Sequence, residues 1–225
     1  MNYTLQFGQV IKDTPYLLAG AIESMELALI SFWIGCLIGL LCNTAHIYGP
    51  KWGRLLVTGY VSLITNSPAV IVLFLLFNAL PEFGILLTPF EAAAIGLTLV
   101  AGAYLTEIQG AAFISVRQSE TEAAEVLGFS RLQVIWYVVI PHMVRTLYAP
   151  LSNFFILMIL GSSISALIGV EDLMGRAINL SSSSMRSIEV FMLVAGIYFT
   201  MTVLASYLLV AVGRRIFRVQ VGVFT

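Results

Sequence analysis

Stretches without any Asp, Glu, Lys or Arg alternate with short polar segments along this chain. Four such apolar stretches occupy residues 27–45, 55–81, 146–170 and 190–213, and a fifth, at 92–116, contains the single acid Glu107. Each is about as long as the ~20 residues that a helix needs to cross the hydrocarbon core of a bilayer. The pattern therefore predicts five transmembrane helices.

The fold class expected from this pattern is an all-α integral membrane protein, with a single transmembrane domain over residues 1–225. Composition agrees, because 59% of the residues are hydrophobic and only 10% are charged, against roughly 45–50% and about 25% in soluble domains. The expected spans are about 20–46, 55–80, 92–116, 144–170 and 188–212, with a polar loop at about 117–142.

Basic residues predict the orientation, because short cytoplasmic loops retain Lys and Arg. One side of the five-span arrangement has Lys51, Arg54, Arg117, Arg131, Arg145, Arg214, Arg215 and Arg218, and the other has Lys12, Arg176 and Arg186. The N-terminus is therefore expected outside, and the C-terminus and loop 117–142 in the cytoplasm. Four consecutive serines at 181–184 are expected in an exposed outer loop. The net charge of −1 argues against a nucleic-acid partner.

Polar and helix-breaking residues inside the spans are candidates for a transport pathway, because lipid makes each of them costly unless it faces protein or water. Asn66, Ser67 and Pro68 are consecutive in the second span, and Pro68 is expected to bend that helix. Ser162 and Ser163 are consecutive in the fourth span. Close helix packing is the alternative interpretation of both clusters.

Glu107 is the one charged residue of the third span, about one turn from its cytoplasmic end. Snorkelling of the carboxylate to the headgroups would explain it, whereas an intramembrane carboxylate is by default a functional-site hypothesis. Cys36 and Cys42 are six positions apart in the first span and do not share a helical face. They are expected to be packing residues, so no metal site is predicted.

The segment "ETEAAEVLGFSRLQVIWYVVIPH", residues 120–142, is too polar to face lipid. Its first part is expected to be a short cytoplasmic helix in which acidic residues surround the small Ala123 and Ala124, and which Gly128 ends. Pro141 is expected to break the following piece before the fourth span. Such a helix can dock a soluble partner, and an ordinary amphipathic surface loop is the alternative.

The spacing within this segment resembles a known signature. Glu122, Ala123 and Ala124 are followed by three residues, Gly128, nine residues, and the aliphatic-x-aliphatic-Pro ending at Pro141. The complete set is similar to the motif of the membrane subunits of bacterial ATP-binding-cassette importers, and every spacing is met. The resemblance implies that these five residues couple the chain to an ATPase.

The resemblance extends along most of the chain and is closest to the permeases for polar amino acids. Three segments resemble the family's "RGTPLLVQ", "GAYLAEIFRGGI" and "NxFIxLLKDTSLxSxIGVxEL": "TNSPAVIV" from residue 65, "GAYLTEIQGAAF" from residue 102 and "NFFILMILGSSISALIGVEDL" from residue 153. The pathway candidates lie in these segments, and they are Asn66, Ser67, Pro68, Tyr104, Glu107, Ser162 and Ser163.

Several charged or polar residues of the family pattern are missing. Thr65 and Gly110 stand where the family has Arg, Val72 stands where it often has Gln, and Leu160 with Gly161 replaces a Lys-Asp pair. A different permease that supplies charged contacts would explain these departures, and so would a less charged substrate. A heterodimer of two permeases is therefore favoured over a homodimer.

The resemblance implies a multi-pass protein of the bacterial cytoplasmic (inner) membrane and three kinds of protein partner. They are a second permease subunit, an ATPase dimer that binds ATP and Mg²⁺, and an extracytoplasmic amino-acid-binding protein. The chain itself is expected to bind no cofactor and to catalyse no reaction, since its sequence contains no GxxxxGK[ST] phosphate loop.

A different class of transporter would use Glu107 directly. In an ion-gradient-driven secondary transporter or channel subunit, this carboxylate would be the proton or sodium site. Dependence of uptake on ATP distinguishes the two classes. A scaffold without transport activity is the third reading, and it predicts that Pro68→Ala and Glu107→Gln leave uptake unchanged.

Overall fold

The computed structural model describes residues 5–115 and 118–217, and every regular element in these ranges is helical. The elements are α1 (Phe7–Val10), η1 (Ile11–Asp13), α2 (Thr14–Tyr48), α3 (Lys51–Thr65), α4 (Ala69–Asn78), η2 (Leu80–Phe83), α5 (Pro89–Ser115), α6 (Gln118–Val126), α7 (Arg131–Val134), η3 (Ile135–Val139), α8 (Ile140–Gly161), η4 (Ser162–Ile168), α9 (Leu173–Ser184) and α10 (Ser187–Phe217). The expected all-α class is confirmed. Arg117 and Arg218, which entered the orientation count, lie outside the described residues.

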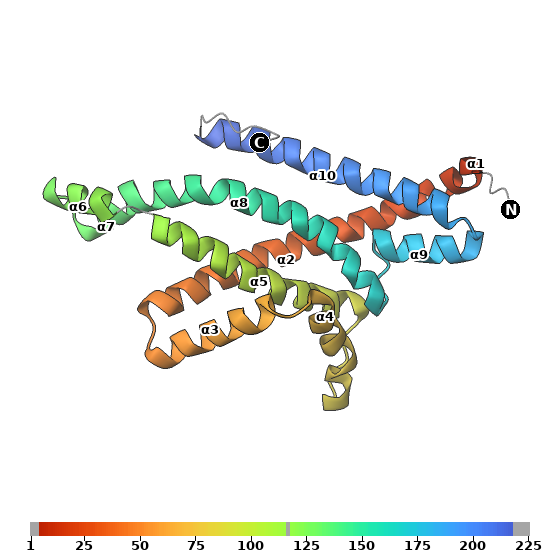
Figure 1. The fold of residues 1–225 in the computed structure, drawn as a ribbon, viewed down its shortest axis with the longest axis horizontal. Helices are drawn as coiled ribbons and strands as arrows, with labels where there is room; N and C mark the ends of the chain where they lie inside the picture. The colour runs from red at the N-terminus through yellow and green to blue at the C-terminus, as the bar shows by residue number, and fades with distance from the viewer. Residues whose placement is uncertain (1–4, 116–117, 218–225) are drawn as a thin grey trace.

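Four long helices, α2, α5, α8 and α10, run along the long axis of the molecule (Figure 1). Within the described residues, four stretches are long and apolar enough to cross a membrane, and they are Ile11–Tyr48, Pro89–Ser115, Leu132–Ile168 and Ser187–Ile216. A fifth crossing exists only if α3 and α4, which meet at an angle of 102°, count as one broken span. The structure therefore has four to five candidate spans.

The predicted bend in the second span is a complete interruption of the helix. α3 ends at Thr65 and α4 starts at Ala69, immediately after Pro68. Pro68 has no N–H to donate into α3, while the side chains of Asn66 and Ser67 donate to the carbonyls of Ser62 (2.8 Å) and Leu63 (2.6 Å). Figure 1 shows α4 turning away from the direction of α3. Side chains thus occupy carbonyls near the end of α3.

The closest helix pair is α2 with α5, and small residues allow the approach. A methyl group added at Gly35 would lie only 2.7 Å from Ala101 Cβ and 3.1 Å from Gly102 N. About two turns further along α2, the Asn43 amide donates to Gly39 O (3.0 Å) on its own helix and to Thr106 O (2.9 Å) on α5. Close backbones and an interhelical amide are typical of helix packing in membranes.

The helix α9 is fixed to α2 at the end of the molecule that carries α1 (Figure 1). Asp172 caps α9 by accepting from Gly175 N (2.9 Å) and also accepts from the Ser24 hydroxyl on α2 (3.1 Å). Arg176 on α9 pairs with Glu23 on α2, with 2.7 Å between Nη2 and Oε1. The prediction of an exposed serine loop was wrong, because residues 181–184 form the last turn of α9.

Elements that the basic-residue count places on the same side of the membrane lie at the same end of the molecule. α6 and α7 lie at one end together with the α2–α3 turn and the C-terminal end of α10, while α1 and α9 lie at the opposite end (Figure 1). This grouping agrees with the basic-residue count, in which the first end faces the cytoplasm. Which end is cytoplasmic stays a prediction. Neither Cys36 nor Cys42 forms a disulfide.

Candidate functional site

The helix α6 ends in a glycine-dependent turn, as the sequence predicted. Gly128 has a φ of +86°, in the left-handed region. Its N–H donates to Glu125 O (2.9 Å), and the N–H of Phe129 donates to Ala124 O (3.1 Å). These two bonds are the Schellman arrangement, which satisfies the last carbonyls of a helix and favours Gly at the left-handed position. The chain therefore reverses direction sharply after α6.

One face of α6 is buried against the protein and the rest is accessible. Ala124 is only 5% exposed, whereas Val126 and Leu127 are 88% and 77% exposed. Glu122 and Ala123 are also exposed, and α6 packs on α7 and η3. Ala124 therefore positions the helix, and its neighbours form an apolar surface with an acidic edge.

Pro141 does not break the chain before the fourth span, so that prediction was wrong. The segment from Arg131 to Gly161 is helical throughout, and Pro141 lies in the first turn of α8. The turn before it, η3, is a π-helix, in which hydrogen bonds close to the fifth residue back. A proline normally clashes with the carbonyl four residues earlier, and this wider turn accommodates it.

A contact between His142 and Glu120 connects α6 to α8. The Nδ1 atom of His142 lies 3.7 Å from Oε2 of Glu120, and both side chains are partly exposed. Phe129, in the turn after α6, contacts the ring of Tyr137 at 6.3 Å between centroids. The segment around α6 is thus attached to the following helical segment both by this polar contact and by packing of aromatic rings.

A second polar region surrounds the break between α3 and α4. The hydroxyl of Tyr104, on α5, lies 3.5 Å from Thr65 O, the last residue of α3. The ring of Tyr104 also contacts Phe154 on α8 at 6.0 Å between centroids. Asn66 and Pro68 are exposed and Ser67 is half-buried. The structure therefore brings the second-span candidates next to Tyr104.

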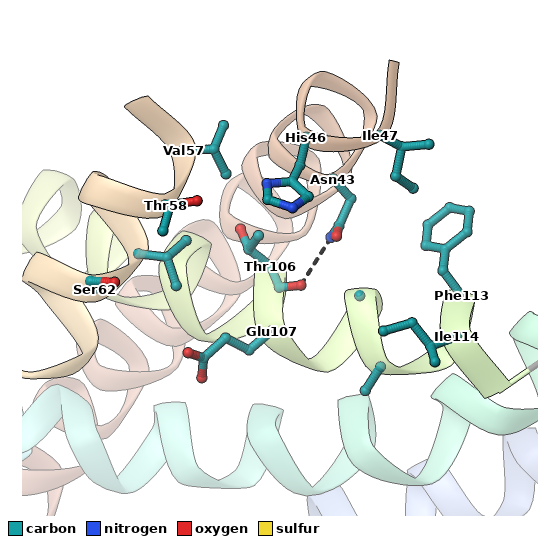
Figure 2. A pocket seen from close by; sticks show the side chains of 13 residues that line it. Asn43, His46, Ile47, Val57, Thr58, Ser62, Thr106, Glu107, Phe113 and Ile114 are labelled. Atoms are coloured by element: carbon teal, nitrogen blue, oxygen red, sulfur yellow. Dashed lines mark hydrogen bonds between the residues drawn. The ribbon is translucent and has the colours of Figure 1, made fainter. Parts of the chain in front are cut away.

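Glu107 lies one turn after Tyr104 on the accessible side of α5, where both residues are exposed. It lines a cavity of about 640 Å³ between α2, α3 and α5, together with Asn43, His46, Thr58 and Ser62 (Figure 2). Sequence reasoning did not include Asn43 or His46 in a site. The signal that could have found Asn43 is its amide inside a predicted span.

The two serines of the fourth span differ in their surroundings. α8 changes at Ser162 into the 3₁₀ helix η4, which packs against α4. Ser162 is fully buried and donates to Ile159 O (2.8 Å). Ser163 is half-buried and donates to Leu160 O (2.7 Å). The structure brings this segment next to the broken helix, with Ser162 inside the packed protein.

The turn before α9 contains a buried carboxyl group. The Asp172 carboxyl is fully buried, and burial raises its pKa, although the hydrogen bonds from Gly175 and Ser24 act in the opposite direction. Elsewhere, no group of three or more His, Cys, Asp or Glu side chains that could hold a metal ion occurs among the described residues.

These features define a class of protein before any comparison is made. A bundle of membrane-length helices has one interrupted helix, and at one end it presents a short helix with an apolar surface. The arrangement suits a membrane component of an assembly in which a soluble protein docks at that end.

Comparison with known proteins identifies the family. A family model described as "Binding-protein-dependent transport system inner membrane component" matches residues 27–219. The chain belongs to this family, and it is a multi-pass permease subunit of an ATP-binding-cassette importer. The resemblance inferred from the EAA spacing is thereby confirmed.

Individual relatives are similar in sequence over almost the whole chain. It is 30% identical over 203 residues to the glutamine transport system permease protein GlnP of Escherichia coli (strain K12), covering 89% of this chain and 93% of that protein. It is also 30% identical over 205 residues to the L-cystine transport system permease protein TcyB of Bacillus subtilis (strain 168), covering 91% and 88%.

Solved structures agree with the fold. The crystal structure of an amino acid ABC transporter with histidines contains a chain that superposes with a TM-score of 0.89 at 32% identity, covering 95% of this chain and 100% of that one. An inward-facing structure of the MetNI methionine ABC transporter superposes with a TM-score of 0.69 at 17% identity, which is a likeness of fold alone.

Proposed function

We propose that the chain is one half of the translocation pathway of an ATP-driven importer of polar amino acids, and that it couples to its ATPase through residues 120–141. The observation that carries the proposal is the exposed, Gly128-terminated helix α6 with its matched Glu122-Ala123-Ala124 motif. The printed names of GlnP and TcyB, which concern glutamine and L-cystine, support the substrate class.

The coupling surface consists of the exposed side of α6 and the turn that follows it. Val126 and Leu127 offer apolar area to a cleft, and Glu122 offers charge at its edge. Ala124 holds α6 against the protein, and the turn at Gly128 keeps bulky atoms away from the end of the helix. ATP and Mg²⁺ bind to the ATPase dimer, so this chain converts closure of that dimer into motion.

The substrate pathway passes the interruption between α3 and α4. Asn66 and Ser67 provide polar groups at this interruption beside Pro68, and Tyr104 and Glu107 continue the route along α5. Irregular backbone at membrane depth is tolerated where it lines a cavity or is buried in protein. Ser163 belongs to the same region, whereas the complete burial of Ser162 supports a packing role for its hydroxyl.

The charged residues of the family pattern that this chain lacks bear on the identity of its second permease partner. Leu160 and Gly161 provide no charge at the end of α8, and Thr65 provides none at the end of α3. A second, different permease would supply the charged contacts for a zwitterionic substrate, so we favour a heterodimer. An extracytoplasmic amino-acid-binding protein would deliver the substrate at the end that carries α1 and α9.

The test is a matched pair of glycine variants in the reconstituted importer. Gly128 and Gly84 both have positive φ, and neither would place a new Cβ within 4 Å of another atom. Leucine therefore costs a similar backbone strain of about 1–2 kcal/mol at each site. Gly128→Leu is expected to abolish ATP-dependent uptake while the chain still inserts, and Gly84→Leu is expected to retain it.

Equal uptake by Gly128→Leu and wild type would contradict the coupling role of α6. The gradient-driven alternative is tested in the same vesicles, because uptake that survives removal of ATP but collapses with an ionophore would favour it. Membership of the importer family does not favour that alternative.

A further inference from the structure

The cavity beside Glu107 lies between three helices near one end of the molecule. Its walls come from α2 (Asn43, His46), α3 (Thr58, Ser62) and α5 (Glu107, Gly110), with apolar side chains between them. The volume of about 640 Å³ lies within the ~300–1,000 Å³ range of small-molecule pockets. Figure 2 shows Asn43 and His46 extending from α2 and Glu107 from α5, with the Glu107 side chain directed away from Asn43.

Two polar groups of this cavity, the Glu107 carboxylate and Asn43 Oδ1, are hydrogen-bond acceptors. The Nδ2 group of Asn43 is occupied by the carbonyls of Gly39 and Thr106, which leaves its Oδ1 as an acceptor. That oxygen faces Gly110, because a Cβ built there would lie 3.0 Å from it. The hydroxyls of Thr58 and Ser62 also line the cavity, and each can both donate and accept hydrogen bonds.

Glu107 adds a negative charge without a counter-ion. Its carboxylate makes no hydrogen bond or ion pair with any residue in the described parts of the chain, and His46 makes none either. Gly110, one turn after Glu107, provides no side chain, at a position where the resembled motif has Arg. A cation on a neighbouring turn would pair with this carboxylate, and this chain supplies none there.

We propose that this cavity binds the ammonium or guanidinium group of a small organic cation, with the Glu107 carboxylate accepting its hydrogen bonds. Charged N–H donors are the complement of a carboxylate, and such bonds are about twice as strong as neutral ones. The apolar side chains of Val57, Val61 and Ile114 line the same cavity and contact the ligand's methylene stem.

The ammonium group has two possible sources, a soluble solute and the headgroup of phosphatidylethanolamine. For a solute, the inference deepens the proposed function, because it specifies a cationic polar amino acid as the substrate class and rests on that function for its role in uptake. Binding itself requires no ATPase, so it is measured on the isolated full-length chain.

The experiment uses the purified chain in phosphatidylglycerol nanodiscs, whose lipid contains no ammonium group. L-lysine and L-arginine are titrated against L-norleucine and L-citrulline, which keep the α-ammonium and α-carboxylate groups but lack the side-chain charge, with calorimetry and thermal unfolding as readouts. We expect the cations alone to bind, and Glu107→Gln to weaken that binding at least about tenfold. Glu26→Gln is the matched control, because Glu26 is exposed on α2 and does not line the cavity.

A second arm replaces part of the lipid by phosphatidylethanolamine. Stabilisation by this lipid that Glu107→Gln removes, without binding of lysine or arginine, would support the site with a lipid source. Absence of both effects, or effects that Glu107→Gln leaves intact, overturns the proposal. If the wild-type chain binds neither the cations nor the lipid headgroup but the Gly128 experiment shows ATPase coupling, only the proposed cation site is rejected. If the chain binds cations but the Gly128 experiment shows no coupling, only the proposed importer mechanism is rejected.

Discussion

The contact between α2 and α5 gives the sharpest prediction about stability. Replacing Gly35 by Ala adds one methyl group whose carbon would lie 2.7 Å from Ala101 Cβ and 3.1 Å from Gly102 N. Non-bonded carbon atoms prefer about 3.5–4.0 Å, so the two helices must separate by roughly 1 Å. Neither neighbouring atom can rotate away, because one is a Cβ and the other is backbone.

The cost follows from this geometry. Overpacking a tight core costs about 1–3 kcal/mol, and rigid neighbours place Gly35→Ala in the upper part of that range. Exchange of Gly for Ala inside a helix returns up to about 1 kcal/mol. The control Gly196→Ala, on α10, gains the same propensity and meets nothing within 4 Å. The two variants should therefore differ by about 2–3 kcal/mol in the free energy of unfolding.

The assay is unfolding of the purified chain in mixed micelles, with the same preparation for both variants and for the double variant Gly35→Ala/Ala101→Gly. The second substitution removes the Ala101 Cβ that would lie 2.7 Å away. It should therefore restore most of the free energy of unfolding that Gly35→Ala removes, apart from the helix-propensity cost of the new glycine. If Gly35→Ala and Gly196→Ala are equally stable, the close α2–α5 contact does not limit packing and the reasoning is refuted.

Three further predictions concern the polar sites. Burial raises the folded-state pKa of Asp172, so its contribution to stability is fully present below the unfolded pKa of about 3.9 and is lost as pH rises through the folded pKa. Asp172→Asn should remove this dependence while keeping the cap, whereas Asp172→Ala should cost about 0.5–2 kcal/mol; identical pH profiles of unfolding for Asn and wild type would contradict this. Pro68→Ala restores an N–H at the helix break and should slow uptake by the intact importer. Unchanged initial rates of uptake would show that the break has only a structural role. His142→Gln should lower the free energy of unfolding by less than about 1 kcal/mol, because its pair with Glu120 is partly exposed; a larger loss in the same micelle assay would reveal a stronger coupling.

The coupling segment shows where sequence reasoning succeeds. Gly128 could be assigned to the end of α6 because a left-handed residue after a helix favours glycine whatever surrounds it. Pro141 misled the same reasoning, since local preference predicts a break. The π-helical turn η3 accommodates the proline, and formation of that turn depends on how the whole segment packs.

Charge-free runs, basic loops and the EAA spacing are properties of the chain itself, so the sequence determined the membrane class, the all-helical fold and the family. The 102° angle between α3 and α4, the burial of Ser162 and the contact of Tyr104 with Thr65 needed the tertiary structure. Each depends on side chains far apart in sequence. The cavity beside Glu107 has the same origin, because its residues come from three helices that only packing brings together.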